Sequence, residues 1–426
     1  MLDLRFIREN PESVRRAIRA KQLPDAIATL DKLLLVDEEH RLLRQDLEEK
    51  QAKRNASSKE IGDRKRNGEQ ADELIREMGS LSAAVKRLEE KSRVLEAQVD
   101  ELQLEIPNLP HESVPYGESE HDNVVVHERG EAPSLDFEPK PHWELAVERG
   151  WIDLEAGVKI AGAGFPVFRG VGARLVRALE RYFLDRARER GYEEIIPPLL
   201  VNAASARATG QLPDKEGQMY RLEEGLYLIP TSEVSLANLH RGEILDESLL
   251  PLRYVAFTPC FRREAGSHGK EVRGINRVHQ FDKVEVVQLT HPELSYETLE
   301  QMTEEAEELL GELGLRYRRL LMCTGDMGFT QAKKYDLEVW SVGQGRWLEV
   351  SSVSNITEFQ AQRLQTRFRP GGAGGRGRPE MVHTLNGSAL ALPRTLAAIL
   401  EQYQRADGSV VVPEVLRPYV GTELLE

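Results

Sequence analysis

The stretch Phe261-Arg262-Arg263-Glu264-Ala265-Gly266 carries the strongest functional signal in this chain of 426 residues, and Arg273, Arg277, His279-Gln280-Phe281 and Glu285 follow it. An Arg just after an apolar strand can present its planar guanidinium to a phosphate or a carboxylate. In that strand Glu264 would lie on the same face as Arg262 and could accept a hydrogen bond from an amino group. Phe281 could stack on a flat base, and Arg277 adds a second cation. A charged hairpin with surface salt bridges is the alternative interpretation.

Composition and charge indicate the number of domains and argue against one class of function. Hydrophobic residues make up 40% of the chain and charged residues 30%, and the formal net charge is −14. The length allows two or three domains. The acidic total argues against indiscriminate DNA binding but not against a local basic patch.

The two cysteines, Cys260 and Cys323, cannot build a disulfide framework, which favours a reducing, cytoplasmic compartment. The first residues lack an apolar signal region, so no secretory signal is expected. No uncharged apolar run approaches eighteen residues, so we expect no membrane span.

Residues 1–106 are predicted to form a helical arm domain, with long helices over roughly 26–61 and 69–106. The second segment carries a seam at alternating spacings of four and three, with Ser92 as its polar break: Leu74, Met78, Leu81, Val85, Leu88, Ser92, Leu95, Val99, Leu102 and Ile106. Such a seam is typical of a coiled coil. Because Asn67-Gly68 supplies a short turn between the segments, the helices should pair antiparallel.

The predicted tip of that arm is basic. Between residues 50 and 66, Glu60 and Asp63 are outnumbered by seven cations: Lys50, Lys53, Arg54, Lys59, Arg64, Lys65 and Arg66. This pattern fits a finger that grips a phosphate backbone. It fits equally a solvated helix surface that keeps the arm soluble, and the residues alone leave both interpretations open.

The remainder of the chain has mixed character. Residues 107–120 are rich in proline and predict a linker. In 121–426, short β-branched runs such as 124–126 and 284–287 alternate with helical stretches at 171–190, 295–313 and 394–405. We therefore expect an α+β domain over 121–426, which the resemblance described next implies is the catalytic domain.

Three stretches in this domain resemble the motifs of class II aminoacyl-tRNA synthetases. The stretch beginning at Phe261 resembles motif 2, residues 191–198 resemble motif 1, which forms the dimer interface in that class, and residues 387–394 resemble motif 3. Residues 229–233, 279–285, 335–340 and 349–355, together with the arm, are similar to bacterial-type seryl-tRNA synthetases. The resemblance implies an N-terminal antiparallel two-helix coiled-coil arm, then an antiparallel β-sheet domain flanked by helices, in a homodimer.

The resemblance also implies roles for individual residues. Arg262 and Arg394 would be catalytic: Arg262 would hold the α-phosphate and the substrate carboxylate, and Arg394, with Arg277, would clamp the γ-phosphate. Glu264 would accept from the adenine amino group and Phe281 would stack on the base. The implied ATP-binding set is Arg262, Arg263, Glu264, Arg277, Val278, Phe281, Glu349, Val350, Ser351, Ser352 and Arg394.

Two further ligands are implied in the same way. Glu349 and Ser352 would bind Mg²⁺. The implied serine-binding set is Thr231, Ser232, Glu233, Arg262, Glu285 and Ser388. A carboxylate that accepts from the substrate hydroxyl would reject alanine, because alanine would leave it buried and unpaired.

The implied activity is ATP-dependent activation of L-serine to seryl-adenylate, followed by transfer to the 3′ end of tRNA(Ser), and of tRNA(Sec) where it exists, with the basic tip as the tRNA contact.

Three residues depart from the usual pattern of relatives, namely Arg263, Ala389 and Pro393. The alternatives are a ligase that charges a carrier protein, a non-enzymatic RNA-binding protein and a coiled-coil scaffold. Arg262, Arg394 and the basic tip argue against them.

Overall fold

The computed structural model describes residues 1–131, 133–214, 217–264, 273–372 and 375–426, so Ala265 and Gly266 of the quoted stretch lie outside the described residues. Two compact units follow one another along the chain, Met1–Pro107 and Asn108–Glu426. Throughout those described ranges, no helix has the length and apolar character needed to cross a bilayer.

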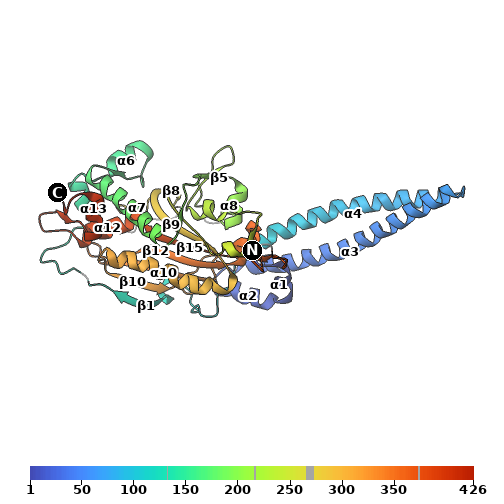
Figure 1. Ribbon diagram of the computed structural model, residues 1–426, viewed down its shortest axis with the longest axis horizontal. Coiled ribbons are helices and arrows are strands. Elements are labelled where there is room, and N and C mark those ends of the chain that lie inside the picture. The colour runs from blue at the N-terminus through green and yellow to red at the C-terminus, as the bar shows by residue number, and fades with distance from the viewer. Residues whose placement is uncertain (132, 215–216, 265–272, 373–374) are drawn as a thin grey trace. The chain divides into compact units, whose positions relative to one another are not determined.

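The first unit is helical. It consists of α1 (Leu4–Glu9), α2 (Pro11–Ala20), α3 (Asp25–Arg66) and α4 (Asp72–Leu104). The two long helices lie side by side, joined by a turn in which Gly68 has a φ of +74° (Figure 1). Such a φ costs glycine little because it has no Cβ. The predicted pair of antiparallel helices is therefore confirmed.

The seam between α3 and α4 contains a polar pair. Val85, Leu95 and Val99 of α4 are buried, as the spacing predicts. At the polar break, Ser92 Oγ lies 3.0 Å from Nε2 of His40 on α3, so each polar side chain satisfies the other. A polar pair inside an apolar seam favours one axial register over shifted alternatives. The break therefore fixes how the two helices align.

An eight-stranded sheet forms the centre of the second unit, in the order β1-β10-β11-β12-β15-β9-β8-β4. Every neighbouring pair is antiparallel except β4 and β8, which are parallel. The strands are β1 (Val124–Arg129), β4 (Glu193–Glu194), β8 (Leu252–Phe261), β9 (Gln280–Thr290), β10 (Tyr317–Leu321), β11 (Lys333–Ser341), β12 (Arg346–Thr357) and β15 (His383–Ala391). The prediction of an antiparallel sheet is confirmed.

Helices α7 (Val171–Glu189), α10 (Ser295–Glu312) and α12 (Leu392–Gln402) contribute with the sheet to the main apolar core, and Figure 1 shows them alongside it. Side chains alternate between the two faces of a strand. On β9, Val284 and Val286 belong to this core, so the odd-numbered residues Phe281, Lys283 and Glu285 point to the other face. That alternation turns Lys283 and Glu285 toward the candidate site, while Phe281 also packs against the core.

The remaining elements are short. They are α5 (His142–Glu148), β2 (Ile152–Asp153), α6 (Leu154–Ala161), β3 (Val167–Phe168), β5 (Leu200–Val201), α8 (Ala203–Thr209), β6 (Tyr227–Leu228), α9 (Glu233–Ala237), β7 (Ile244–Asp246), α11 (Glu358–Leu364), β13 (Arg367–Arg369), β14 (Glu380–Met381), β16 (Val410–Val411), α13 (Arg417–Val420) and β17 (Leu424–Leu425).

The segment predicted as a linker, 107–120, contains no α-helix or strand, but its start is bound to the second unit. Asn108 Nδ2 donates to the carbonyl oxygens of Thr330 and Ile356, both at 2.9 Å. Asn108 is itself buried, so this part of the segment is packed rather than free in solvent.

Candidate active site

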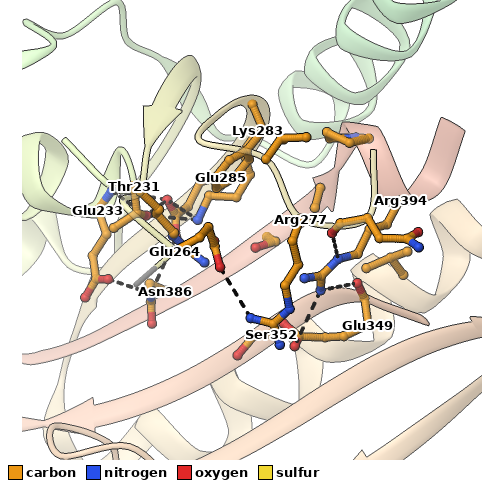
Figure 2. Close-up of a pocket in the computed structure, with 18 of the residues that line it drawn as sticks. Thr231, Glu233, Glu264, Arg277, Lys283, Glu285, Glu349, Ser352, Asn386 and Arg394 are labelled. Atoms are coloured by element: carbon orange, nitrogen blue, oxygen red, sulfur yellow. Dashed lines mark hydrogen bonds and ion pairs between the residues drawn. The ribbon is translucent and has the colours of Figure 1, made fainter. Parts of the chain in front are cut away.

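A pocket opens on the sheet face that carries Phe281, Lys283 and Glu285. Side chains from β9, β12 and β15, from the N-termini of α9 and α12, and from the loop that follows β8 converge there (Figure 2). The sequence-predicted residues that line it are Thr231, Glu233, Arg262, Glu264, Arg277, Val278, Phe281, Glu285, Glu349, Val350, Ser352, Ser388 and Arg394. Segments far apart in the sequence thus meet in one cavity.

Three predicted residues do not line the pocket. Ser232 is completely buried and donates to Glu285 Oε2 at 3.2 Å. Ser351 is buried and donates to the carbonyl oxygen of Ser388 at 2.6 Å. Arg263 is exposed, and its backbone N–H donates to Gln218 O. Ser232 and Ser351 therefore contact lining residues from behind.

The expectation that Arg262 and Glu264 share a strand face is wrong. Strand β8 ends at Phe261, and Glu264 has a φ of +46°, which places it in the left-handed region outside any strand. Both side chains still line the pocket. The loop turn brings them there, not the alternation of a strand.

One end of the pocket is a buried acidic subsite centred on Glu285. Its Oε2 accepts from Thr231 Oγ1, from the Glu233 backbone N–H at 3.2 Å, and from Lys283 Nζ at 2.9 Å. Its Oε1 is approached by Asn386 Nδ2 at 3.5 Å. Oε2 thus has several donors, whereas Oε1 has, among the described residues, only the long contact with Asn386.

Glu233 is the second carboxylate of this subsite. Gln360 Nε2 donates to its Oε1 at 2.5 Å, and Asn386 Nδ2 donates to its Oε2 at 2.9 Å. Burial, with the charge of Glu285 nearby, raises the pKa of Glu233 to about 7. Burial also acts to raise the pKa of Glu285, but Lys283 and the hydrogen-bond donors outweigh it, so that pKa is held below the usual range. Of the two carboxylates, Glu285 is therefore the one that carries the negative charge more readily.

The other end of the pocket is cationic. The Arg262 guanidinium lies over the Phe281 ring, 5.1 Å from its centroid. Arg277 Nη1 donates to Glu264 Oε2 at 3.3 Å. Arg394, from the first turn of α12, donates to the carbonyl oxygen of Glu349 at 2.9 Å. Three guanidinium groups facing one cavity suit a polyphosphate.

A bulge in β12 brings Glu349 and Ser352 to the same cavity. Residues three apart on a regular strand point to opposite faces. Here Ser351 pairs with Leu337 and Glu349 pairs with Glu338, so Val350 is the extra residue. A bulge of this kind reverses the alternation. It is the reason that the two predicted Mg²⁺ ligands can act together.

The oxygen set fits a hard divalent cation. Glu349 supplies a carboxylate and Ser352 a hydroxyl, which are ligand types that Mg²⁺ accepts. Beside Ser352 on the neighbouring strand, Asp336 has its Oδ1 buried without a hydrogen-bond partner. Across the described part of the chain, no three His, Cys, Asp or Glu side chains form a metal cluster. A bound Mg²⁺ would therefore depend on phosphate and water oxygens for the rest of its shell.

Several further polar residues, which the sequence motifs did not indicate, belong to the site. Lys283, Asn276, Gln211, Gln331 and Asn386 also line the pocket. The signal for Lys283 was available, because it lies two residues from both Phe281 and Glu285 on the same strand. The others come from loops or from distant segments, and no local pattern marks them.

The predicted tRNA-binding residues all lie on the C-terminal part of α3. Lys50, Arg64 and Arg66 form ion pairs with acidic residues three or four positions earlier in the same helix. Lys53, Lys59 and Lys65 are exposed and Arg54 is half-buried. The chain that follows is acidic, with Glu69, Asp72, Glu73 and Glu77 against Arg76. The positive charge therefore belongs to one side of the helix pair.

The stretch 191–198 follows α7 and contains the two-residue strand β4, which pairs with β8. Within it the Ile196 side chain is 91% exposed. A single exposed apolar side chain is common on protein surfaces, whereas several together mark an interaction site. Leu200, close in sequence, is also exposed.

Comparisons with known proteins match both units. The seryl-tRNA synthetase N-terminal domain model matches residues 1–110, and the class II tRNA synthetase core domain model (G, H, P, S and T) matches residues 218–403. A curated relative, the serine–tRNA ligase of Salinibacter ruber, is 53% identical over 426 residues, covering 99% of this chain and 98% of that protein.

Solved structures match over the whole chain as well. The seryl-tRNA synthetase of Pyrococcus horikoshii complexed with ATP has a TM-score of 0.94 and 38% identity, covering 100% of this chain and 99% of that one. The cytoplasmic serine–tRNA ligase of Naegleria fowleri in complex with AMP has a TM-score of 0.88 and 30% identity, with the same coverage.

Proposed function

The chain belongs to the seryl-tRNA synthetases, and on that premise we propose which residues of the pocket perform its reaction. The enzyme activates L-serine with ATP to seryl-adenylate and transfers serine to tRNA(Ser). The observation that carries our assignment of roles is that one pocket joins a buried acidic subsite to three arginines.

Serine binds at the acidic end. Glu285 Oε1 accepts from the serine hydroxyl, since Oε2 already has its donors. Glu233 holds the ammonium group, with Thr231 and Ser388 completing the subsite. Alanine would leave Glu285 Oε1 with only the long contact from Asn386, and an under-satisfied buried carboxylate is heavily penalised. Threonine adds one methyl group, and its exclusion by size is worth only about 1–3 kcal/mol.

ATP binds at the cationic end. Phe281 stacks on adenine, and Glu264 accepts from the adenine amino group. Glu264 and Arg277 form an ion pair at 3.3 Å. ATP must therefore break this pair, because its adenine binds Glu264 and its γ-phosphate binds Arg277. Arg277 and Arg394 then clamp the γ-phosphate, while Val278 and Val350 border the nucleotide.

Adenylate formation joins the two ends. The serine carboxylate attacks the α-phosphorus in line, the bond from phosphorus to the bridging oxygen breaks, and pyrophosphate leaves. Arg262 contacts both the carboxylate and the α-phosphate and stabilises the charge that develops on phosphorus. In the second step a terminal ribose hydroxyl of tRNA attacks the adenylate carbonyl and releases AMP. Positioning and charge stabilisation supply the catalysis, without a covalent enzyme intermediate.

Mg²⁺ would be held by Glu349 and Ser352. When bound, it neutralises phosphate charge that would repel the attacking carboxylate. Partial desolvation inside the pocket acts to raise the pKa of Glu349, but the arginines and Lys334 outweigh it and hold the pKa below its usual range. The carboxylate is therefore ionised and ready to bind a cation at neutral pH.

The basic side of α3 contacts the tRNA backbone, and tRNA(Sec) is a second acceptor where it exists. The exposed lysines Lys53, Lys59 and Lys65 support this role. We also propose a homodimer in the cytoplasm, formed through residues 191–198, because Ile196 is exposed there. In that dimer the arm of one subunit serves the active site of the other.

The test is ATP–pyrophosphate exchange with each of the twenty amino acids, with and without Mg²⁺. We expect exchange that requires both serine and Mg²⁺. Exchange with another amino acid would overturn the serine subsite, and exchange that persists in a chelator would overturn the Mg²⁺ assignment. A folded protein with no exchange at all would favour a non-enzymatic RNA-binding role.

A further inference from the structure

The residues that grip ATP are supported by a fully buried pair, His142 and Glu401. His142 is the first residue of α5, and Glu401 lies in the last turn of α12, the helix whose first turn carries Arg394. Both side chains are 0% exposed, and His142 Nδ1 lies 2.8 Å from Glu401 Oε1. Neither residue lines the pocket.

Glu401 accepts hydrogen bonds from two segments, the start of α5 and the end of β11 with the turn that follows it. Its Oε1 also accepts from the His142 backbone N–H at 3.0 Å and from Gln344 Nε2 at 3.1 Å. Its Oε2 accepts from Ser341 Oγ and from the Gly343 backbone N–H at 3.1 Å. Five donors outweigh the effect of burial and hold the pKa of Glu401 below its usual range. A carboxylate at a helix C-terminus is otherwise unfavourable, so these donors explain why it can be ionised there.

The ring of His142 connects this carboxylate to residues 273–278, which we call the strap. His142 Nε2 accepts from the Ile275 backbone N–H at 3.1 Å, so the ring is neutral and its proton lies on Nδ1, facing Glu401. The strap also packs directly on the ring. Gly274 has a φ of +64°, and a Cβ there would lie 2.3 Å from His142 Nε2.

A second connection runs through Asn276. Its Nδ2 donates to Gln344 Oε1 at 2.9 Å, and Gln344 in turn donates to Glu401. The carbonyl oxygen of Asn276 accepts from Arg394 Nε at 2.9 Å. The buried carboxylate of Glu401 is thus linked to the strap, which carries Arg277. Through Asn276 it is also linked to Arg394.

We propose that the His142–Glu401 pair is a positioning device that holds the strap and Arg394 in the geometry that binds ATP. His142 and Glu401 touch no substrate in this proposal; they act through Ile275, Asn276 and Gln344. The inference rests on the proposed function, because it assumes that Arg277, Val278 and Arg394 contact ATP. It predicts that disrupting the pair weakens ATP binding and leaves serine binding nearly unchanged.

Two substitutions at one position separate positioning from general packing. In His142→Asn the amide nitrogen can take the place of Nδ1 and still donate to Glu401, but the acceptor for Ile275 N–H is lost. In His142→Gln the amide oxygen can take the place of Nε2 and keep that acceptor, while the donor to Glu401 is lost and Glu401 keeps its four other donors. An unpaired buried N–H is costly, so we expect His142→Asn to raise the ATP KM about tenfold, equivalent to about 1.4 kcal/mol. We expect His142→Gln to stay within about threefold of the parent enzyme.

The measurements are the ATP and serine KM values in pyrophosphate exchange, and calorimetric binding of a non-hydrolysable α,β-methylene ATP analogue. The serine KM should change by less than about twofold. His240→Asn is the matched control, because His240 also bridges a glutamate and a second group, Glu243 and Tyr254, but lies outside the pocket. If His142→Asn does not fold, Gln344→Ala breaks the second connection on a half-buried turn and should weaken analogue binding about threefold.

Unchanged analogue binding in His142→Asn, or equal increases in the ATP and serine KM values, would overturn the proposal. Impairment of His142→Gln as severe as that of His142→Asn would overturn it as well. A parent enzyme without serine-dependent exchange would overturn the proposed function instead, and analogue binding would still test the positioning role on its own.

Discussion

Lys283 is the buried cation of the serine subsite, and its replacement by methionine tests the electrostatics of that subsite. Its Nζ lies 2.9 Å from both Thr231 Oγ1 and Glu285 Oε2, and the two side chains of the ion pair are 6% and 2% exposed. Removing one partner of a buried pair typically costs about 3–5 kcal/mol. Glu285 keeps donors from Thr231 and from the Glu233 backbone, so we expect the lower end of that range at pH 8.

The cost should depend on pH, and the sign follows from the pKa of Glu285. In the parent enzyme that pKa is lowered, so the stabilising contribution is present above the unfolded value and is lost as pH falls through the folded one. Without Lys283, burial and Glu233 raise the pKa, so Lys283→Met loses stability as pH rises. The stability difference between the parent and the variant should therefore grow from pH 5 to pH 8.

Urea denaturation followed by tryptophan fluorescence measures this difference. All four tryptophans, Trp143, Trp151, Trp340 and Trp347, lie in the second unit, so the signal reports the unit that contains the site. The control is Lys140→Met, which breaks an exposed pair with Glu148 and should cost at most about 1 kcal/mol. The double variant Lys283→Met/Glu285→Gln should lose the pH dependence.

A cost for Lys283→Met no larger than that of the Lys140 control would refute the reasoning. So would a stability difference that stays constant from pH 5 to pH 8, because Glu285 would then not titrate in response to Lys283.

Four further outcomes are expected. Arg262→Ala should abolish pyrophosphate exchange, and near-normal exchange would refute its phosphate role. Deletion of residues 26–104 should spare serine activation and destroy tRNA charging; charging within a few-fold of the intact enzyme would remove the arm from the mechanism. Glu285→Gln should reduce the serine-to-alanine ratio of exchange rates, and an unchanged ratio would mean that another group contacts the hydroxyl. Because Glu233 has a pKa of about 7 and must be ionised to hold the serine ammonium, the serine KM should fall as pH rises from 6 to 8; a flat profile would exclude this role.

Local sequence patterns predicted the elements that depend on few residues. The heptad seam predicted α4, and the turn at Asn67-Gly68 predicted its antiparallel partner, because both are set by contacts within a short length of chain. The motif-like stretches also indicated the residues that now line one pocket, from Thr231 to Arg394. The prediction failed for the backbone of Glu264, because a strand end cannot be located from composition.

Only the tertiary structure determined how those residues act together. The Val350 bulge turns Glu349 and Ser352 toward one cavity, and a spacing of three would otherwise separate them. Glu401 is linked to His142, which lies 259 positions earlier in the chain. The sequence by itself determined which chemical groups are present and the local elements that carry them. Burial, charge pairing and sheet register arise between distant segments, so the ionisation of Glu285, the midpoint of Glu233 and the support of the ATP-binding arginines were decided only on folding.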